Sequence, residues 1–259
     1  MEFQLTIVEE KGKVGIIALN RPERLNALNL QMMDEMLCAL RQLDGNPHIG
    51  AVILKGLGPA FCAGHDFNEL SGKPLGDIRQ TFSKSVKVLQ TMAAIGKPVV
   101  AAVHGIATAM GCALVAGCDL VIASEDARFQ TPGVDIGFAC ISPMAALFRS
   151  VGRKKCLEMI LTGRSIDANE AERIGLVNRV VPGDRLKHEA LEFAGNLAQK
   201  APLAMQLGKQ AFYTMADMEH NQAYAYAAEM ISINADTLDG HEGMAAFIEK
   251  RPHRPWQGR

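Results

Sequence analysis

The feature that most constrains the fold is a strand–turn–helix pattern at residues 97–119. Val99 to Val103 form a short apolar run that Pro98 opens, and the run does not alternate with polar residues. That pattern predicts a strand buried on both faces of a parallel sheet. Small residues then lead into a second apolar run that ends at Gly117. We therefore expect a tight turn followed by a buried helix.

A turn with so few side chains leaves the first N–H groups of the following helix accessible to a ligand. These groups lack partners within the helix, and the helix dipole favours negative charge at this end. The small residues have two explanations at this point. They allow a helix to pack closely on a sheet, or they form an oxyanion site.

A second stretch favours the oxyanion site. Residues 60–70 read Ala-Phe-Cys-Ala-Gly-His-Asp-Phe-Asn-Glu-Leu and follow a predicted strand at residues 51–54. Together with Lys-Pro-Val-Val-Ala-Ala-Val-His-Gly at 97–105, this stretch resembles the crotonase (enoyl-CoA hydratase/isomerase) superfamily. The same resemblance extends, in order along nearly the whole chain, to residues 19–22, 25–28, 161–163, 171–177 and 243–251. Gly-His-Asp at 64–66 and Ala-Thr-Ala at 107–109 are similar to one hydratase-like branch of that family.

The remaining pattern indicates an α/β core followed by helices alone. Strands are predicted at residues 3–9, 14–20, 51–54, 99–103 and 120–123. Helices are predicted at residues 30–44, 76–95, 143–150, 154–161, 202–216, 221–238 and 243–250, with a helix N-cap at Asp167. The resemblance implies a crotonase-like spiral of ββα units over residues 1–195. It also implies a C-terminal all-helical oligomerisation region, residues 196–259, that builds a homotrimer or a hexamer made of two trimers.

Composition narrows the class of protein. The formal net charge of −1 gives no indication of a nucleic-acid partner. No apolar run reaches the ~18 residues that a membrane span needs. The first ten residues lack a signal-peptide pattern, and the six cysteines show no CxxC spacing. We therefore expect reduced thiols, no metal site and a cytoplasmic location.

The resemblance implies that the substrate is an acyl-CoA thioester, with coenzyme A as part of the substrate and no separate cofactor. Its carbonyl oxygen would accept hydrogen bonds from the backbone N–H groups of His65 and Met110. The His65 ring could also transfer a proton near pH 7. Alternatively, the ring packs away from the carbonyl or contacts the CoA moiety. Asp66 is expected to fix the loop or cap a helix rather than react.

Other positions match the substrate contacts of the family. Arg24 and Lys250 would meet the nucleotide and phosphates of CoA, or else they are ordinary solvated charges. The remaining substrate-binding positions that the resemblance implies are Leu25, Ala63, Gly64, Asp66, Gly111, Gly133 and Ile141.

The catalytic acids of the family are missing. The two places where hydratases carry glutamates hold Ala113 and Gly133, and a third carboxylate place holds Ile141. A positioned acid or base is worth ~100- to 10,000-fold in rate, so hydration should be weak or absent. Asp135 is expected at the surface. Cys140 is expected to be an inert buried thiol, although a nucleophile remains the alternative.

These arguments lead to a nominal enoyl-CoA hydratase of fatty-acid metabolism, a lyase by class, with weak hydration. Two alternatives stay open: another CoA-thioester reaction that needs only an oxyanion hole, such as hydrolysis or enolate chemistry, and a non-catalytic acyl-CoA-binding protein. Restoring both glutamates, by Ala113→Glu with Gly133→Glu, would be expected to raise hydration.

Overall fold

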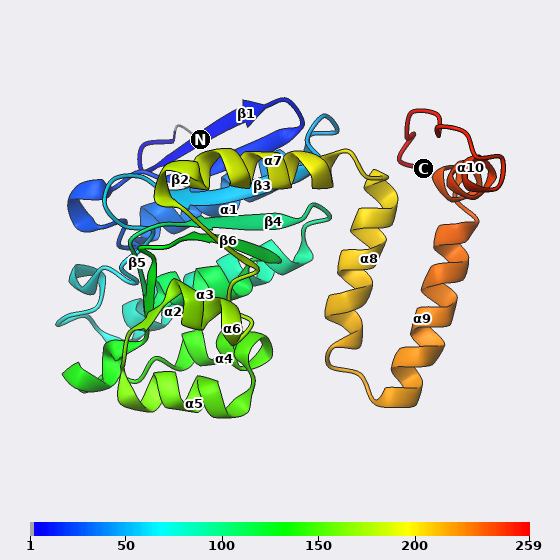
Figure 1. Ribbon diagram of the computed structural model, residues 1–259. Coiled ribbons are helices and arrows are strands. Elements are labelled where there is room, and N and C mark those ends of the chain that lie inside the picture. The colour runs from blue at the N-terminus through cyan, green and yellow to red at the C-terminus, as the bar shows by residue number, and fades with distance from the viewer. Residues whose placement is uncertain (1–2) are drawn as a thin grey trace.

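The computed structural model describes residues 3–259, and Figure 1 shows a layered α/β body with a helical arm at its side. The strands are β1 Thr6–Lys11, β2 Val14–Leu19, β3 Ala51–Gly56, β4 Val99–Val103, β5 Ile106–Thr108, β6 Leu120–Ser124, β7 Arg128–Gln130, β8 Ile166–Asp167 and β9 Arg179–Val181. The helices are α1 Leu30–Gly45, α2 Leu75–Ala94, α3 Met110–Gly117, α4 Ile141–Val151, α5 Arg153–Thr162, α6 Ala168–Arg173, α7 Leu186–Ala198, α8 Pro202–Met215, α9 His220–Ala235 and α10 Leu238–Ile248.

The body is built on a six-stranded sheet in the order β1-β2-β3-β4-β6-β9. Only the β1–β2 hairpin is antiparallel, and the other neighbours run parallel. A small second sheet joins β5, β7 and β8. The predicted parallel, doubly buried strand is confirmed at β4, where every residue is buried.

Alternate residues of the central strands enter two separate apolar clusters. On β3, Val52 and Leu54 face the cluster that contains residues of α1, α2 and α3. Ala51 and Ile53 face the opposite cluster, which α7 covers. The sheet therefore has helices on both faces, as Figure 1 shows, and this is the arrangement that buries parallel strands.

Several predicted boundaries were wrong for identifiable reasons. The first strand begins at Thr6 rather than Phe3, because the N–H groups of Gln4 and Leu5 donate to the buried Glu35 carboxylate instead of to a strand. The predicted helix 221–238 ends at Ala235, since Thr237 caps the next helix by accepting a hydrogen bond from the Gly240 N–H. The cap predicted at Asp167 is confirmed, with the Glu170 N–H as donor.

One helix and four short strands were missed. α7, with Ala190, Ala194 and Ala198 buried against the sheet, was not predicted, and it continues past the proposed boundary at residues 195/196. β5, β7, β8 and β9 have only two or three residues each, too few to show a period. The division into two domains stays a prediction.

The arm consists of α8, α9 and α10. A buried ionic cluster fixes α8, its first helix, to the body. Lys209 of α8 lies 2.7 Å from Asp119, which follows α3, and also donates to the carbonyls of Met92 and Lys97. Asp119 further accepts hydrogen bonds from the Tyr213 hydroxyl at 2.8 Å and the Val99 N–H at 2.7 Å. Beyond this point the arm leaves the body: α9 has no buried residue. No helix within residues 3–259 is long and apolar enough to cross a membrane.

Replacing Lys209 with methionine should destabilise the protein strongly. The substitution keeps the side-chain length but leaves the Asp119 carboxylate without its cation, and breaking a buried pair in this way costs about 3–5 kcal/mol. Urea unfolding checks this. Arg149→Met is the matched control, because Arg149 also joins the body to the arm region, through Asp217, but both side chains are exposed. Such exposed pairs are worth at most about 1 kcal/mol. Equal losses in both variants would contradict the role of the Asp119 cluster.

Candidate functional site

The loop after β3 and the first turn of α3 lie in direct contact. The Cys62 N–H donates to the Ile106 carbonyl, and the Thr108 N–H donates back to the Cys62 carbonyl. Three residues after Thr108, Gly111 approaches so closely that a Cβ there would stand 2.1 Å from the Cys62 oxygen. Only glycine fits this contact, so the residue type at position 111 is what permits the helix to start beside the loop.

This contact brings two free backbone N–H groups together. A Cβ on Gly64 would lie 3.3 Å from the Met110 nitrogen, so Met110 borders the Gly64–His65 peptide. Within residues 3–259, neither the His65 N–H nor the Met110 N–H donates to another group of the protein. Ala109, just before α3, has φ +50° and ψ −113°, a strained conformation for a residue with a Cβ. Its N–H donates to the Gln130 carbonyl, which ties the turn to β7.

An apolar cavity of about 280 Å³ opens beside these two residues. Its lining comes from the loop after β3, from α2, from the start of α3, and from the start of α4 with the three residues before it. The lining residues are His65, Phe82, Ala109, Met110, Phe138, Ala139, Cys140, Ile141, Ser142 and Pro143. Phe82 and Phe138 stack with ring centroids 5.9 Å apart. Among residues 3–259, no carboxylate lines the cavity.

The His65 ring lines this cavity rather than packing away from it. It meets Phe82 edge-on, with centroids 4.9 Å apart, and its Nε2 is buried without a hydrogen-bond partner in the described chain. Burial away from water lowers the pKa of His65 to about 4. The imidazole is therefore neutral at pH 7, with one ring nitrogen available to a ligand.

Asp66 holds the loop in place. Its carboxylate lies 2.7 Å from Arg21 and accepts hydrogen bonds from the N–H and side-chain amide of Asn68. Burial alone would raise the pKa of Asp66, but the hydrogen bonds from Arg21 and Asn68 outweigh burial and lower it. Asp66 does not line the cavity.

The early loop, residues 20–29, is bound to the same structure by backbone and side-chain hydrogen bonds. The Leu25 carbonyl accepts from the Ala63 N–H, and the buried Asn26 side chain donates to the carbonyls of Leu57 and Ala60. Leu25 and Asn26 both have left-handed φ values, 51° and 56°. The sequence analysis gave Arg21 and Asn26 no role, although both lie within the motifs at residues 19–22 and 25–28 that carried the resemblance.

The places of the missing acids are sterically closed. Ala113 is fully buried in α3, and a Cβ on Gly133 would stand 2.0 Å from the Phe138 carbonyl oxygen. Neither residue lines the cavity. The expectation that Gly133→Glu with Ala113→Glu would raise hydration therefore does not fit this structure, because the Phe138 backbone occupies the space that a glutamate needs.

The other candidate residues lie in different places. Ile141 and the buried Cys140 line the cavity, and burial raises the pKa of the Cys140 thiol, which keeps it protonated at neutral pH. Asp135 is exposed and lies outside the lining. His104 contacts the Gly58 carbonyl at 2.7 Å through its ring Nε2.

The two predicted CoA-binding cations are not brought together. Arg24 is exposed in the turn Pro22–Arg24, next to the loop that contacts Ala63. Lys250 lies two residues after the end of α10, which Figure 1 shows at the outer end of the arm, away from α3. Within one chain, Lys250 does not belong to this site. Residues 3–259 also contain no cluster of His, Cys, Asp and Glu that could hold a metal ion.

Comparison with known proteins decides the family. Residues 9–259 match the model of the enoyl-CoA hydratase/isomerase family. The chain belongs to this family. It is 38% identical over 248 residues to the mitochondrial enoyl-CoA hydratase domain-containing protein 3 of Danio rerio, covering 95% of this chain and 86% of the relative. That relative represents the branch that the 64–66 and 107–109 motifs indicated.

Solved structures of the family share the fold. An enoyl-CoA hydratase from Mycobacterium smegmatis superposes with a TM-score of 0.94 at 37% identity, over 98% of this chain and 99% of the other. The human enoyl-CoA hydratase domain-containing protein 3 gives a TM-score of 0.94 at 34% identity, over 97% and 100%. The crotonase-like fold is thus confirmed.

The buried His65 should make the protein less stable in mild acid. The folded state resists protonation down to about pH 4, whereas the unfolded chain takes up a proton near pH 6.5. Above pH 6.5 this residue therefore leaves the free energy of unfolding unchanged. As the pH falls to about 4, protonation of His65 in the unfolded chain lowers that free energy by about 3 kcal/mol. Urea unfolding between pH 7 and pH 5 measures the slope. His65→Ala should flatten it, while the exposed control His188→Ala should keep it. An identical slope in the His65 variant would refute the assignment.

Proposed function

We propose that this protein binds an acyl-CoA thioester and polarises its carbonyl with the N–H groups of His65 and Met110. The observation that carries the proposal is the pair of unpartnered amides beside a small apolar cavity. Because both donors are fixed by the Gly111–Cys62 contact, they need no rearrangement to receive an oxyanion, and one such donor is worth ~100- to 1000-fold in rate. The names of the relatives support CoA chemistry at this site.

The same cavity argues against efficient hydration. Adding water across an enoyl double bond needs a group that activates water and a group that handles the proton at Cα. Within residues 3–259, no carboxylate lines the cavity, and the imidazole that lines it, that of His65, has a pKa of about 4. A base so far below the working pH transfers protons inefficiently. Enoyl-CoA hydration is thus expected to be weak.

A second candidate function follows from the orphaned ring nitrogen of His65. A neutral imidazole beside an oxyanion site can orient a water molecule toward the thioester carbonyl. Attack by this water forms the acid, breaks the C–S bond and releases CoA, whose thiolate takes up the proton that the water loses, and this reaction is hydrolysis. The low pKa of His65 predicts that hydrolysis is slow. If the ring only positions the thiol part of CoA, the protein is an acyl-CoA-binding protein without turnover. Incubating the protein with a panel of acyl-CoA thioesters separates these outcomes, because hydrolysis releases free CoA and binding does not.

The carbonyl contact can be tested without altering the protein. Butyryl-CoA should bind about thirtyfold more tightly than the thioether S-butyl-CoA, which lacks only the carbonyl oxygen and forfeits two hydrogen bonds of about 1 kcal/mol each. Calorimetric titration of both ligands measures the ratio, with free CoA as the control for the rest of the molecule. Equal affinities would show that the His65 and Met110 amides do not hold the carbonyl.

Steady-state hydration of crotonyl-CoA tests the missing acids. Turnover should stay close to the uncatalysed rate, because no positioned carboxylate is available. A kcat in the ordinary enzyme range of ~1 to 1000 per second would overturn this interpretation and move attention to His65, Cys140 and Asp135.

The helical arm supports a proposal about assembly. Its exposed apolar side chains include Tyr224 (66% exposed), Ile231 (63%), Phe247 (85%) and Ile248 (76%), which is more apolar surface than a free arm normally presents. We propose that they pack against other copies of the chain in a trimer or hexamer. Such packing would also bring Lys250 of one copy toward the CoA of another. The cytoplasmic location stays a prediction.

Sedimentation velocity at micromolar concentration should therefore show a trimer or hexamer. Phe247→Asp with Ile248→Asp should shift the distribution toward monomer, because the apolar area that drives association would carry charge. A wild-type protein that sediments only as a monomer would exclude this assembly.

Lys250→Ala should weaken the binding of CoA in the assembled form and lower the salt dependence of that binding, as expected for a charge contact near water.

A further inference from the structure

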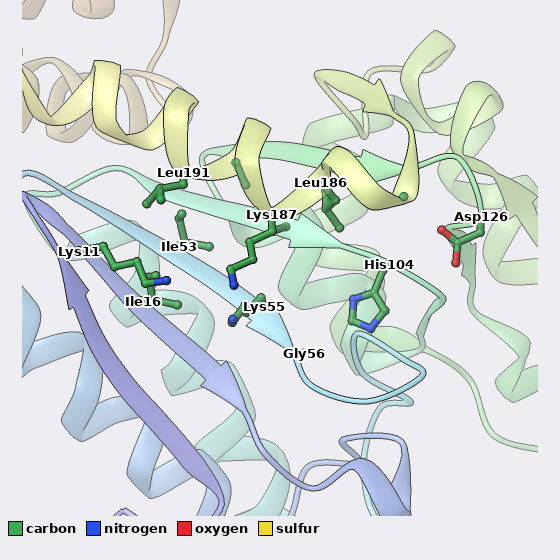
Figure 2. Close-up of a pocket in the computed structure, with 13 residues that line it drawn as sticks. Lys11, Ile16, Ile53, Lys55, Gly56, His104, Asp126, Leu186, Lys187 and Leu191 are labelled. Atoms are coloured by element: carbon green, nitrogen blue, oxygen red, sulfur yellow. The ribbon is translucent and has the colours of Figure 1, made fainter.

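A larger cavity of about 510 Å³ lies on the opposite face of the main sheet, beneath α7. Figure 2 shows it between the helix and strands β2, β3 and β4. Its lining comes from β1, β2, β3, β4 and α7 and from the loops after β4, β6 and β9, and it shares no residue with the cavity beside His65. The size falls within the range of about 300–1,000 Å³ that is typical of small-molecule sites.

The floor and roof of this cavity are apolar. Ile16 of β2 pairs with Ile53 of β3, and both belong to the cluster that α7 covers. The side chains of Leu186 and Ala190, one turn apart on α7, pack in the same cluster. An unbranched hydrocarbon chain matches such a slot because it has no polar group to satisfy.

Three lysines stand at one side of this apolar slot. Lys55 follows Ile53 by two residues on β3, so its side chain leaves the strand on the α7-covered face, where the other members are apolar. Figure 2 shows Lys11 and Lys187 near it, one from the end of β1 and one from the first turn of α7. Among residues 3–259, none of the three forms a salt bridge or a side-chain hydrogen bond.

The charge balance of this site calls for an anion. Burial lowers the pKa of Lys55, Glu9 partly offsets this, and the neighbouring charges of Lys187 and Lys11 lower it further. The polar groups at the other side are already occupied. His104 contacts the Gly58 carbonyl, and Asp126 accepts hydrogen bonds from Ser124 and the Gly105 N–H. The ammonium groups of the three lysines, by contrast, have no partner within residues 3–259, and Lys55 is the half-buried one.

We propose that this cavity binds an amphiphilic carboxylate, with its hydrocarbon chain between Ile53 and α7 and its carboxylate against Lys55 and Lys187. A carboxylate there would gain charge-assisted hydrogen bonds and relieve the repulsion among the three ammonium groups. The site is independent of the proposed thioester site, from which the main sheet separates it.

Calorimetric titration of the full chain with decanoate tests the proposal. Decanoate should bind saturably, and acetate and decan-1-ol should each bind about tenfold more weakly or worse, since each lacks one of the two features the cavity recognises. Lys55→Met and Lys187→Met should each weaken decanoate about tenfold or more, because methionine keeps the apolar stem and removes the charge. Lys154→Met is the control, an exposed lysine that removes one charge elsewhere. Thermal melting checks that the variants fold.

Two further measurements locate the ligand. Saturating S-butyl-CoA should leave the affinity for decanoate unchanged, because the two cavities share no residue. Decanoate should also protect Lys55 from reductive methylation, as read by mass spectrometry. The proposal is overturned by an absence of saturable decanoate binding, by equal affinity in wild type and Lys55→Met, or by displacement of decanoate by the CoA thioether. None of these outcomes depends on whether the protein turns over a thioester.

Discussion

The close approach of the Cys62 carbonyl to Gly111 is the contact on which the candidate site depends. It holds the first turn of α3 against the loop after β3, and no side chain larger than hydrogen fits between them. The contact places Met110 beside the Gly64–His65 peptide, and the N–H groups of His65 and Met110 have no partner within residues 3–259. The Arg21–Asp66 ion pair and the Asn26 hydrogen bonds support the loop from the other side. The cost of keeping two amides unpaired is thus met by the surrounding packing.

The parallel sheet explains why the molecule has two cavities of different chemistry. Because β2, β3 and β4 are buried on both faces, each face needs its own covering of helices. On one face, the start of α3 meets aromatic rings and leaves a cavity with unpartnered amides and a neutral imidazole. On the other face, α7 leaves an apolar slot with three lysines. The first suits a carbonyl that gains negative charge, and the second suits a ligand that already carries one.

The body and the arm are stabilised in different ways. Asp119, at the end of α3, links the sheet to α8 through Lys209 and Tyr213, so the base of the arm is fixed relative to the site. Past α8, the helix α9 has no fully buried residue, and α10 buries Asp239 and Ala246. An isolated helix of this length is only marginally stable in water, because most helical stability in proteins comes from packing. This sparse burial is the observation on which the proposed assembly rests.

The sequence by itself determined the family, the α/β order and the positions of the two segments that meet at the site. Those signals are local: the apolar run at 99–103, the small residues after it, and the Gly-His-Asp motif. It could not reveal α7 as a cover for the sheet, the closure of position 133 by the Phe138 carbonyl, or the convergence of Lys11, Lys55 and Lys187. Each of these depends on which segments, distant along the chain, become neighbours. Period and motif report what one segment prefers, whereas burial, steric closure and the lowered pKa of His65 come from atoms that only the folded chain brings within a few ångströms.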